Sequence, residues 1–195
     1  MKRDGMKVVV LNGSPRRNGL VSRMLRHISD ALPEGCRREE FFVHDLKIRP
    51  CTGCMACRSQ GRCVLPDDDG HRLAEALRSA DALVVGSPCY WGNMSGVLKT
   101  AFDRVVCVMM GESPDGMPRP LHRGKRAVLV ATCNTAWPFS VWFRQTGGVF
   151  RALREILGWS GYRVVGTLGK GGCRRCGELT RREIEKCKKL ARKIC

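Results

Sequence analysis

The most constraining feature of the sequence is an apolar run that leads directly into a polar, glycine-containing loop and then into a helical pattern. Val8 to Leu11 form the apolar run, which is typical of a strand buried on both faces. The loop NGSPRRNG occupies residues 12–19, and apolar residues recur at helical spacing from about Gly19 to Leu32. A strand, a loop and a helix in this order indicate the first unit of a parallel α/β sheet.

Strand and helix patterns alternate along the rest of the chain. The expected strands span residues 41–43, 82–86, 127–131 and 163–168, and the expected helices span residues 67–80, 95–109, 147–157 and about 179–194. Residues 51–63 form a long cysteine-rich loop, and residues 111–124 form a connection rich in proline and glycine. The sequence therefore predicts a single domain over residues 1–195, of α/β class, with a five-stranded parallel sheet and helices on both faces.

The formal net charge of +17 favours phosphate-rich or acidic partners but does not choose among them. Much of this charge lies in the basic C-terminal helix at about 179–194, which also suits a solvated surface helix. Aromatic side chains are not interleaved with those charges, so we expect no specific nucleic-acid binding. The apolar runs are too short to cross a bilayer. We therefore expect no membrane association and a cytoplasmic location.

The loop at residues 12–19 has the position of an anion-binding loop. It follows the carboxyl end of a strand and precedes a helix, whose amino terminus offers unpaired N–H donors and a partial positive charge. Ser14 and Ser22 add hydroxyl groups, and Arg16 adds charge. The loop matches neither the Walker pattern nor GxGxxG, and its short length suits a terminal monophosphate. The alternative is that these residues only cap the helix.

The loop after the third strand, with sequence SPCYWGNMSG, places two aromatic residues next to each other in a turn. The apolar faces of Tyr90 and Trp91 can bind a planar ring, while backbone N–H groups from Gly92 to Met94 reach its polar edge. Core packing of the two aromatic side chains is the alternative. The loops after the first and third strands would flank one crevice at the switch point of a parallel sheet.

Four of the twelve cysteines form the compact pattern CxxCxxCx5C at Cys51, Cys54, Cys57 and Cys63. Four thiolates can bind a [4Fe-4S] cluster, and one loop can wrap it without long-range constraints. Structural zinc and a metal-free loop are the alternatives. Disulfides rarely persist in a reducing cytosol, so the clustering indicates metal first.

The remaining cysteines and the histidines carry weaker signals. Cys173 and Cys176 could form a redox pair or, with Cys187 and Cys195, a second metal site, but the spacing favours unligated thiols. Cys107 and Cys133 follow apolar runs and are expected in the core or in a pocket. The histidines are scattered along the sequence, and no side chain is predicted to act as a catalytic acid or base.

Three motifs together resemble those of the flavodoxin-like NAD(P)H-dependent FMN reductase family, in the branch that includes the iron-sulfur flavoproteins. The motifs are LNGSPRRNG, CTGCMACRSQGRCVLPDDD and SPCYWGNMSGVLKTAFDR, and the resemblance covers roughly residues 6 to 170. It implies a flavodoxin-like sheet and an FMN site. The phosphate would be held by Ser14, Arg16 and Ser22. The flavin would be lined by Pro88, Tyr90, Trp91, Gly92, Asn93 and Met94, and approached from its other side by Thr132, Cys133 and Asn134.

Two functions follow from the resemblance. The first is an FMN-dependent oxidoreductase that takes hydride from NAD(P)H and reduces a flavin, a quinone or another small acceptor. The alternative is an iron-sulfur flavoprotein that carries electrons from ferredoxin through a [4Fe-4S] cluster to FMN, in which the positive charge helps to dock an acidic donor. The resemblance also implies a homo-dimer or homo-tetramer. A nucleic-acid binding module is a third possibility without a supporting motif.

Overall fold

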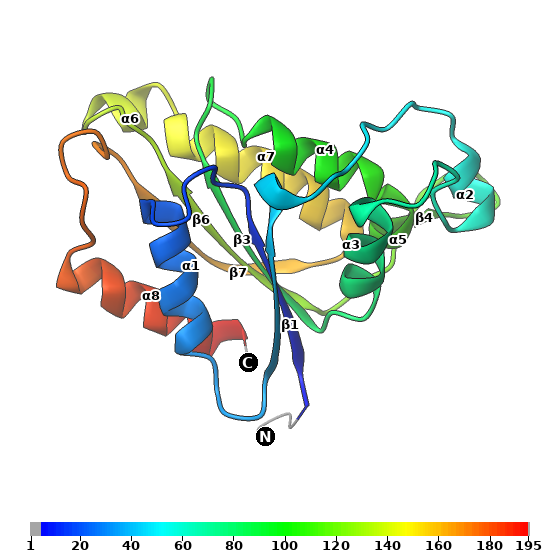
Figure 1. Cartoon of the computed structure of the whole chain (residues 1–195), viewed down its shortest axis with the longest axis horizontal. Coiled ribbons are helices and arrows are strands. Elements are labelled where there is room, and N and C mark those ends of the chain that lie inside the picture. Colours follow the sequence, from blue (N-terminus) through cyan, green and yellow to red (C-terminus); the bar gives the residue numbers. More distant parts are fainter. Residues whose placement is uncertain (1–4, 195) are drawn as a thin grey trace.

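A computed structural model describes residues 5–194 and contains the predicted five-stranded parallel sheet. The strands follow the order β2-β1-β3-β6-β7 across the sheet (Figure 1). Their bounds are Lys7–Asn12 for β1, Arg37–Phe42 for β2, Ala82–Pro88 for β3, Arg126–Thr132 for β6 and Arg163–Lys170 for β7. The strand order reverses between β1 and β3, which is where open α/β sheets bind their ligands. The prediction of a flavodoxin-like α/β fold is confirmed.

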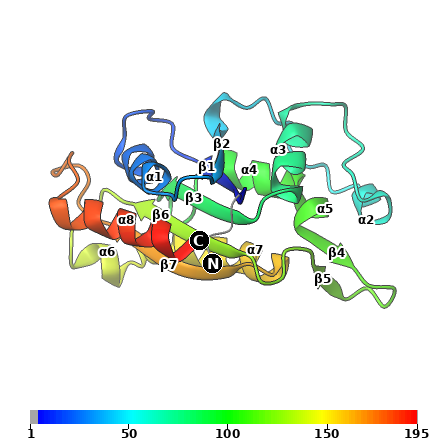
Figure 2. The same cartoon turned by 90° about the horizontal axis from the view of Figure 1, so that it is seen from below.

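Alternate residues of β1 face two separate apolar cores. Val9 and Leu11 pack with the helices on one face, and Val8 and Val10 pack with those on the other. The first face is covered by α3 (Asp69–Arg78), α4 (Gly96–Arg104) and α7 (Gln145–Ser160), and the second by α1 (Leu20–Asp30) and α8 (Arg181–Ile194) (Figures 1 and 2). Burial on both sides explains why β1 is a continuous apolar run rather than an alternating one.

Strand β2 begins earlier than the predicted residues 41–43. Its first four residues are charged, from Arg37 to Glu40, and they pair in parallel with β1 at the edge of the sheet. Charged side chains on an edge strand discourage pairing with another chain. The predicted Val43 instead starts the short 3-10 helix η1 (Val43–Asp45).

Several short elements interrupt segments that were expected to be uniform. The expected helix 95–109 ends as α4 at Arg104 and resumes as α5 (Val106–Met109), because Val105 leaves the helical conformation. The β-branched Val105 and Val106 have a lowered helix propensity. The expected loops also contain elements, namely α2 (Ala56–Gln60), the antiparallel pair β4 (Met110–Glu112) and β5 (Pro118–Pro120), and α6 (Phe139–Trp142).

The expected basic C-terminal helix is present as α8, and it is amphipathic. Cys187, Leu190 and Ile194 are buried against the sheet and α1, while the lysine and arginine side chains are largely exposed. Burial raises the pKa of Cys187 to about 11, so this thiol is a protonated core side chain. Among residues 5–194, no helix combines the length and the apolar character needed to span a bilayer.

Candidate functional site

A cavity of about 420 Å³ lies at the carboxyl ends of β1, β3 and β6. The loops that follow these strands leave the sheet at the upper edge of the view in Figure 1. Cavities of about 300–1,000 Å³ are typical of cofactor sites. Predicted cofactor residues line much of it: Ser14, Arg16, Pro88, Tyr90, Thr132, Cys133 and Asn134. Lining residues that the sequence reasoning did not assign include Asn18, Leu20, Cys89, Cys173 and Gly177.

The loop after β1 is held in place by its own hydrogen bonds. The N–H of Ser14 donates to Asn12 Oδ1 at 3.0 Å, and the N–H of Arg16 donates to Ser14 Oγ at 3.1 Å. Ser22 Oγ donates to the carbonyl oxygen of Arg16 at 2.7 Å and accepts from Asn12 Nδ2 at 2.8 Å. Ser22 does not line the cavity, so its hydroxyl orders the loop from behind.

The amino terminus of α1 opens directly into the cavity. Its N-cap residue, Gly19, provides no side-chain cap, and Gly19, Leu20 and Val21 line the cavity. First-turn N–H groups have no partner inside a helix and favour an anion. A Cβ atom at Gly19 would lie 2.9 Å from Cβ of Arg16, so the loop closes tightly around this point. This end of the cavity therefore has the donors and the charge that a phosphate group requires.

The loops after β1 and β3 are tied to each other. Ser95 Oγ donates to the carbonyl oxygen of Gly13 at 2.7 Å, and the N–H of Ser95 donates to Ser87 Oγ at 2.9 Å. The N–H of Gly13 donates to the carbonyl oxygen of Gly86 at 2.8 Å. The two walls of the cavity are thus fixed relative to each other before any ligand binds.

The tip of the loop after β3 is a tight two-residue turn. Tyr90 and Asn93 exchange backbone hydrogen bonds of 2.9 Å in both directions, and Trp91 and Gly92 both have positive φ angles of 52° and 71°. Tyr90 lines the cavity, whereas Trp91 is 103% exposed and points into solvent. The N–H of Asn93 is used inside the turn.

Trp91, Gly92, Asn93 and Met94 do not line the cavity, and their expected contact with the flavin stays a prediction. Met94 is only 5% exposed and packs in the core between α4 and the sheet, and its N–H donates to Asn93 Oδ1 at 2.8 Å. The physical reason is the tight turn, which directs residue 91 outward and returns residue 94 to the protein interior.

The loop after β6 supplies a further part of the cavity wall, directly beside the loop that follows β3. Thr132 and Cys133 are buried, the N–H of Cys89 donates to the carbonyl oxygen of Thr132 at 2.7 Å, and the N–H of Cys133 donates to that of Lys170 at 2.9 Å. The N–H of Cys173 donates to the carbonyl oxygen of Cys133 at 3.1 Å. Burial is the main reason that the pKa of Cys133 is raised, and the neighbouring thiols of Cys89 and Cys173 raise it further.

The four predicted metal ligands line a second cavity of about 650 Å³, next to α5 and the β4–β5 pair. Cys107, which was expected in the core or in a pocket, lines the same cavity. Burial raises the pKa of Cys57, and the thiols of Cys107, Cys63, Cys51 and Cys54 add to this effect. Within residues 5–194, no three His, Cys, Asp or Glu side chains are arranged to hold a metal ion. The chemistry of the donor set fits an iron-sulfur cluster, but the thiols are not assembled around one point.

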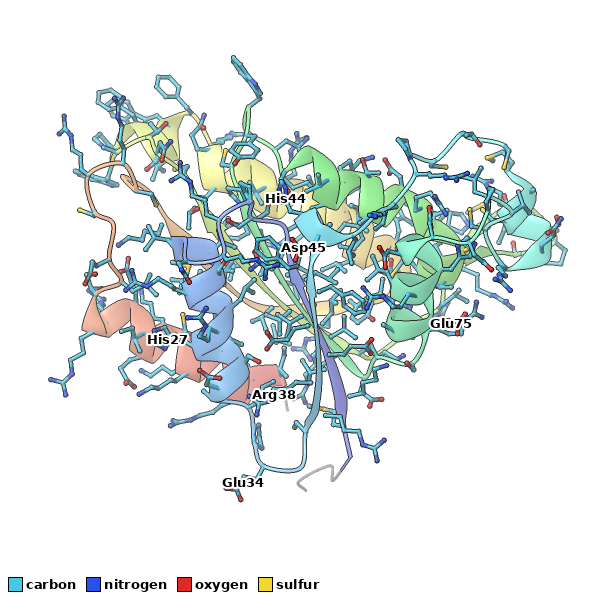
Figure 3. All side chains as sticks on the ribbon, in the orientation of Figure 1. His27, Glu34, Arg38, His44, Asp45 and Glu75 are labelled. Atoms are coloured by element: carbon cyan, nitrogen blue, oxygen red, sulfur yellow. The ribbon has the colours of Figure 1, made fainter. Side chains whose placement is uncertain are left out.

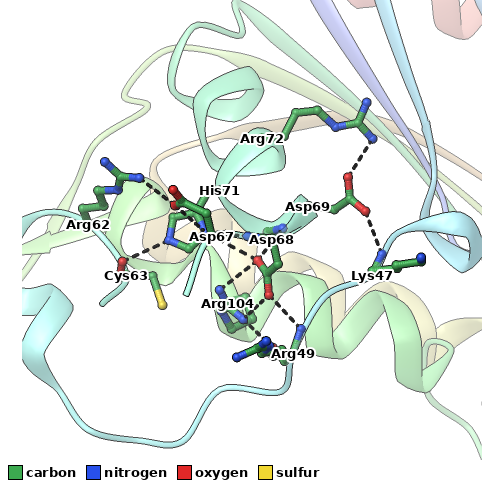
Figure 4. Close-up of polar contacts among 11 residues, drawn as sticks. Lys47, Arg49, Arg62, Cys63, Asp67, Asp68, Asp69, His71, Arg72 and Arg104 are labelled. Atoms are coloured by element: carbon green, nitrogen blue, oxygen red, sulfur yellow. Dashed lines mark hydrogen bonds and ion pairs between the residues drawn. The ribbon is translucent and has the colours of Figure 1, made fainter. Parts of the chain in front are cut away.

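Both ends of the cysteine loop are anchored to the fold by buried polar groups (Figure 4). Asp68 caps α3, accepts from the N–H of Arg49 at 3.0 Å, and pairs with Arg104. Burial alone would raise the pKa of Asp68, but the hydrogen bonds from Arg49 and Arg104 lower it below its ordinary value. His71 contacts the carbonyl oxygen of Cys63 at 3.0 Å. The loop is therefore fixed where it enters and leaves the domain.

The other predicted thiols and histidines form no further metal-binding cluster in residues 5–194. Cys173 and Cys176 are free, and Cys187 is buried in the core, while Cys195 lies outside the described residues. Figure 3 shows His27 on α1 and His44 in η1, well separated from each other. Asp45, beside His44, pairs with Arg17 of the loop after β1.

Comparison with known proteins places the chain in a family. The model of the family described as NADPH-dependent FMN reductase matches residues 6–167. An iron-sulfur flavoprotein of Methanocaldococcus jannaschii is 36% identical over 100 residues, covering 51% of this chain and 51% of the relative. Another, of Archaeoglobus fulgidus, is 31% identical over 150 residues, covering 77% of this chain and 69% of the relative. The chain thus matches about half the length of the first relative and more of the second.

A solved structure supports the fold. The FMN-dependent NADH-azoreductase of Bacillus anthracis, solved in complex with FMN, has a TM-score of 0.71 and covers 96% of this chain and 98% of its own. The two sequences are 12% identical, so this structural similarity shows only that they share a fold. Taken with the family match over residues 6–167, the strand order and the three motifs lead to one conclusion. The chain belongs to the NADPH-dependent FMN reductase family, in its iron-sulfur flavoprotein branch.

Proposed function

We propose that this chain is an FMN-dependent oxidoreductase that takes hydride from NAD(P)H and reduces a small acceptor such as a flavin or a quinone. The observation that carries this proposal is the cavity at the carboxyl ends of β1, β3 and β6. One end of it is the open amino terminus of α1, and its wall contains Tyr90. An anion-binding end joined to a wall with an aromatic ring matches the two parts of FMN, a phosphate and a planar ring system.

The phosphate of FMN would be held at the α1 end of the cavity. Ser14 Oγ, the guanidinium group of Arg16 and the first-turn N–H groups at Leu20 and Val21 would act as its donors. Ser22 would support this group indirectly, because its hydroxyl holds the carbonyl oxygen of Arg16. Because Gly19 has no Cβ atom, no side chain occupies the space beside Arg16, and this space stays available for the phosphate.

The ring of FMN would lie against the neighbouring loops after β3 and β6. Pro88 and Tyr90 would line one part of the ring site, and Thr132, Cys133 and Asn134 would line the neighbouring part. Bound FMN accepts a hydride and can release the electrons one at a time, and the protein contributes orientation and electrostatics. The buried Thr132 and Cys133 would exclude water from the inner part of the cavity. The position of Tyr90 would be set by the turn that follows it, which contains Trp91, Gly92, Asn93 and Met94.

A matched pair of arginine variants tests the phosphate site. Arg16 lines the cavity, whereas Arg17 is an exposed neighbour that pairs with Asp45 and stacks on Phe42. We expect Arg16→Gln to weaken FMN binding about tenfold. Riboflavin, which lacks the phosphate, should bind equally to the Arg16→Gln variant and the original chain. Arg17→Gln should change neither affinity, and equal losses in both variants would argue against a phosphate site at Arg16.

Anaerobic reduction tests the activity itself. The FMN-loaded protein is mixed with NADH or with NADPH, and the flavin absorbance is followed before any acceptor is added. Bleaching of the flavin by either nucleotide supports the proposed hydride transfer. Failure of both nucleotides, with flavin bound, would remove nicotinamide nucleotides as donors and leave an electron-transfer protein.

A second function, transfer of single electrons through an iron-sulfur cluster, is favoured by the cysteine cavity. Cys51, Cys54, Cys57 and Cys63 would hold a [4Fe-4S] cluster, and a ferredoxin-type acidic donor would dock on the basic surface. We expect anaerobically purified protein to contain iron and sulfide. Cys54→Ser should lose the iron and keep FMN, whereas Cys176→Ser, at another exposed cysteine, should keep both. Unchanged iron in Cys54→Ser would argue against this assignment.

Self-association into a dimer or tetramer is a further part of the proposal. The segment from Trp137 to Phe143, which includes α6, exposes the apolar side chains of Trp137, Phe139, Val141, Trp142 and Phe143. An exposed apolar patch of this kind favours a protein interface. We expect light scattering to detect a dimer or larger species that Trp142→Glu disrupts. Trp159→Glu, at an exposed tryptophan of α7 outside this segment, serves as the control.

A further inference from the structure

Three thiols from separate loops line the cavity proposed for FMN. Cys89 follows β3, Cys133 follows β6, and Cys173 follows β7. All three are free cysteines, and they lie far apart in the sequence. The proposed hydride transfer uses none of them. Thiols beside a redox cofactor can take part in its chemistry, so their mutual arrangement matters.

Cys133 and Cys173 are the pair that the backbone brings together. The N–H of Cys173 donates to the carbonyl oxygen of Cys133 at 3.1 Å. A direct backbone hydrogen bond holds two α-carbons near the span that disulfides bridge, about 4.4–6.8 Å. Both side chains line the same cavity, and burial, the Cys89 thiol and the Cys173 thiol, in that order, raise the pKa of Cys133. Cys89, in contrast, directs its Sγ to Gln145 Oε1 at 3.4 Å.

Neither thiol of the pair is held strongly elsewhere. Cys133 Sγ lies 3.5 Å from the carbonyl oxygen of Thr135, and Cys173 Sγ lies 3.4 Å from that of Lys170. A thiol is a weak hydrogen-bond donor, so these contacts are easily exchanged for a bond between the two sulfur atoms. Formation of a disulfide would therefore break only these two weak thiol hydrogen bonds.

The two thiols differ in access to solvent. Cys133 is 3% exposed at the inner wall, whereas Cys173 is partly exposed in the loop after β7. The exposed Arg174 and Arg175 follow Cys173 directly and give this rim a positive charge. A small anionic molecule would therefore meet Cys173 first, and Cys133 would be the thiol that resolves any mixed disulfide.

We propose that Cys133 and Cys173 form a dithiol–disulfide centre that transfers electrons from FMN in this cavity to a small organic disulfide. The inference rests on the proposed FMN site. In the first step the two cysteine thiols reduce the substrate disulfide: its S–S bond breaks, an S–S bond forms between Cys133 and Cys173, and the two cysteine protons go to the two product thiols. In the second step reduced FMN would supply two electrons and two protons, the S–S bond between Cys133 and Cys173 would break, both cysteine thiols would be restored, and the bound FMN would be oxidised.

An electron count tests the centre. The FMN-loaded protein is treated anaerobically with oxidised glutathione, freed of excess reagent, and titrated with dithionite while the flavin absorbance is followed. We expect the original chain to take up one electron pair more per chain than Cys173→Ser treated in the same way. Cys176→Ser is the matched control, because Cys176 is an exposed cysteine of the same loop outside the cavity, and it should behave like the original chain.

Peptide mapping of the treated protein identifies the bond. A disulfide between the peptides that contain Cys133 and Cys173 supports the proposal. A disulfide between Cys173 and Cys176, or equal electron uptake by Cys173→Ser and the original chain, overturns it. Cys133→Ser is a second variant and should also lose the additional electron pair. A preparation that binds no flavin would instead show failure of the proposed FMN site, which the absorbance reveals separately.

Discussion

Arg104 and Asp68 form a doubly hydrogen-bonded ion pair in the protein interior, directly beneath the cysteine loop (Figure 4). The two N–H···O distances are 2.9 and 3.1 Å, and the side chains are 1% and 8% exposed. Arg104 Nη1 also donates to the carbonyl oxygen of Arg49 at 2.7 Å, and Asp68 accepts from the N–H of the same residue. One ion pair thus joins α4, the start of α3 and the segment that leads into Cys51.

Removal of this carboxylate should be strongly destabilising. Asp68→Ala leaves a buried guanidinium group without its partner, which costs about 3–5 kcal/mol of unfolding free energy. Urea unfolding followed by circular dichroism measures the loss. Asp67→Ala is the matched control, because Asp67 is 80% exposed and pairs with Arg62 at the surface, and it should cost about 1 kcal/mol or less. Equal effects in the two variants would show that Arg104 is solvated rather than buried.

The same pair predicts acid sensitivity. The pKa of Asp68 is lower in the folded state than the value of about 3.9 in an unfolded chain. Its carboxylate therefore contributes stability above about pH 4, and this contribution is lost as the pH falls through the folded-state pKa. Between pH 5 and pH 2, the free energy of unfolding should fall less steeply for Asp68→Ala than for the original chain. Parallel pH profiles would contradict this assignment.

His122 predicts a second pH dependence, closer to neutrality. Burial, assisted by the charge of Lys125, lowers the pKa of His122 despite the opposing hydrogen bond to the Val108 carbonyl. Nε2 contacts that carbonyl at 2.8 Å and Nδ1 contacts Lys125 Nζ at 3.2 Å, so the neutral ring suits both partners. Because the unfolded state takes up a proton first, stability should fall as the pH drops below about 6.5, until the folded-state pKa is passed.

A variant isolates this contribution. His122→Gln should be less stable at pH 8 and should lose less stability between pH 8 and pH 5 than the original chain. His44→Asn is the control, since His44 is exposed on η1. If His44→Asn flattens the pH profile as much as His122→Gln, the buried imidazole is not the source of the slope.

Gly148 predicts a sharp difference between two neighbouring glycines of α7. A Cβ atom at Gly148 would overlap the carbonyl oxygen of Gly92 in the turn beside the cavity, whereas one at Gly147 would meet only Arg144 Cβ at 3.7 Å. We expect Gly148→Ala to cost about 1–3 kcal/mol and to weaken FMN binding, because the turn must move. Gly147→Ala should be neutral or stabilising by up to about 1 kcal/mol. Thermal unfolding and FMN titration of both variants decide the matter.

The sheet could be predicted from local patterns because its central strands are buried on both faces. Val8 to Leu11 and Ala127 to Ala131 are apolar without interruption, and few structures other than a parallel sheet accommodate such runs between helices. Shorter features could not be predicted. The break at Val105 rests on only a slight difference in helix propensity, and the three-residue strands β4 and β5 are too short to show an alternating pattern.

The positions of site residues could be predicted where they lie at or just after the end of a strand. The side-chain directions within the tight turn after β3 could not. Ser14, Pro88 and Thr132 occupy the edge of the sheet that the strand ends dictate. The outward direction of Trp91 follows from backbone angles that no residue pattern specified. Cys173 contacts Cys133 through a backbone hydrogen bond between segments 40 positions apart, whereas the sequence had grouped Cys173 with Cys176, Cys187 and Cys195.

Every tryptophan of this chain lies on its surface, since Trp91, Trp137, Trp142 and Trp159 are all exposed. In a single chain their fluorescence should already resemble that of indole in water, so unfolding of the monomer will shift the emission wavelength very little. A flavin bound beside Tyr90 would absorb light in the range in which these indoles emit, and Trp91 stands next to it in sequence. The intrinsic emission of this protein is therefore a poor optical reporter of denaturation and a sensitive reporter of cofactor loading.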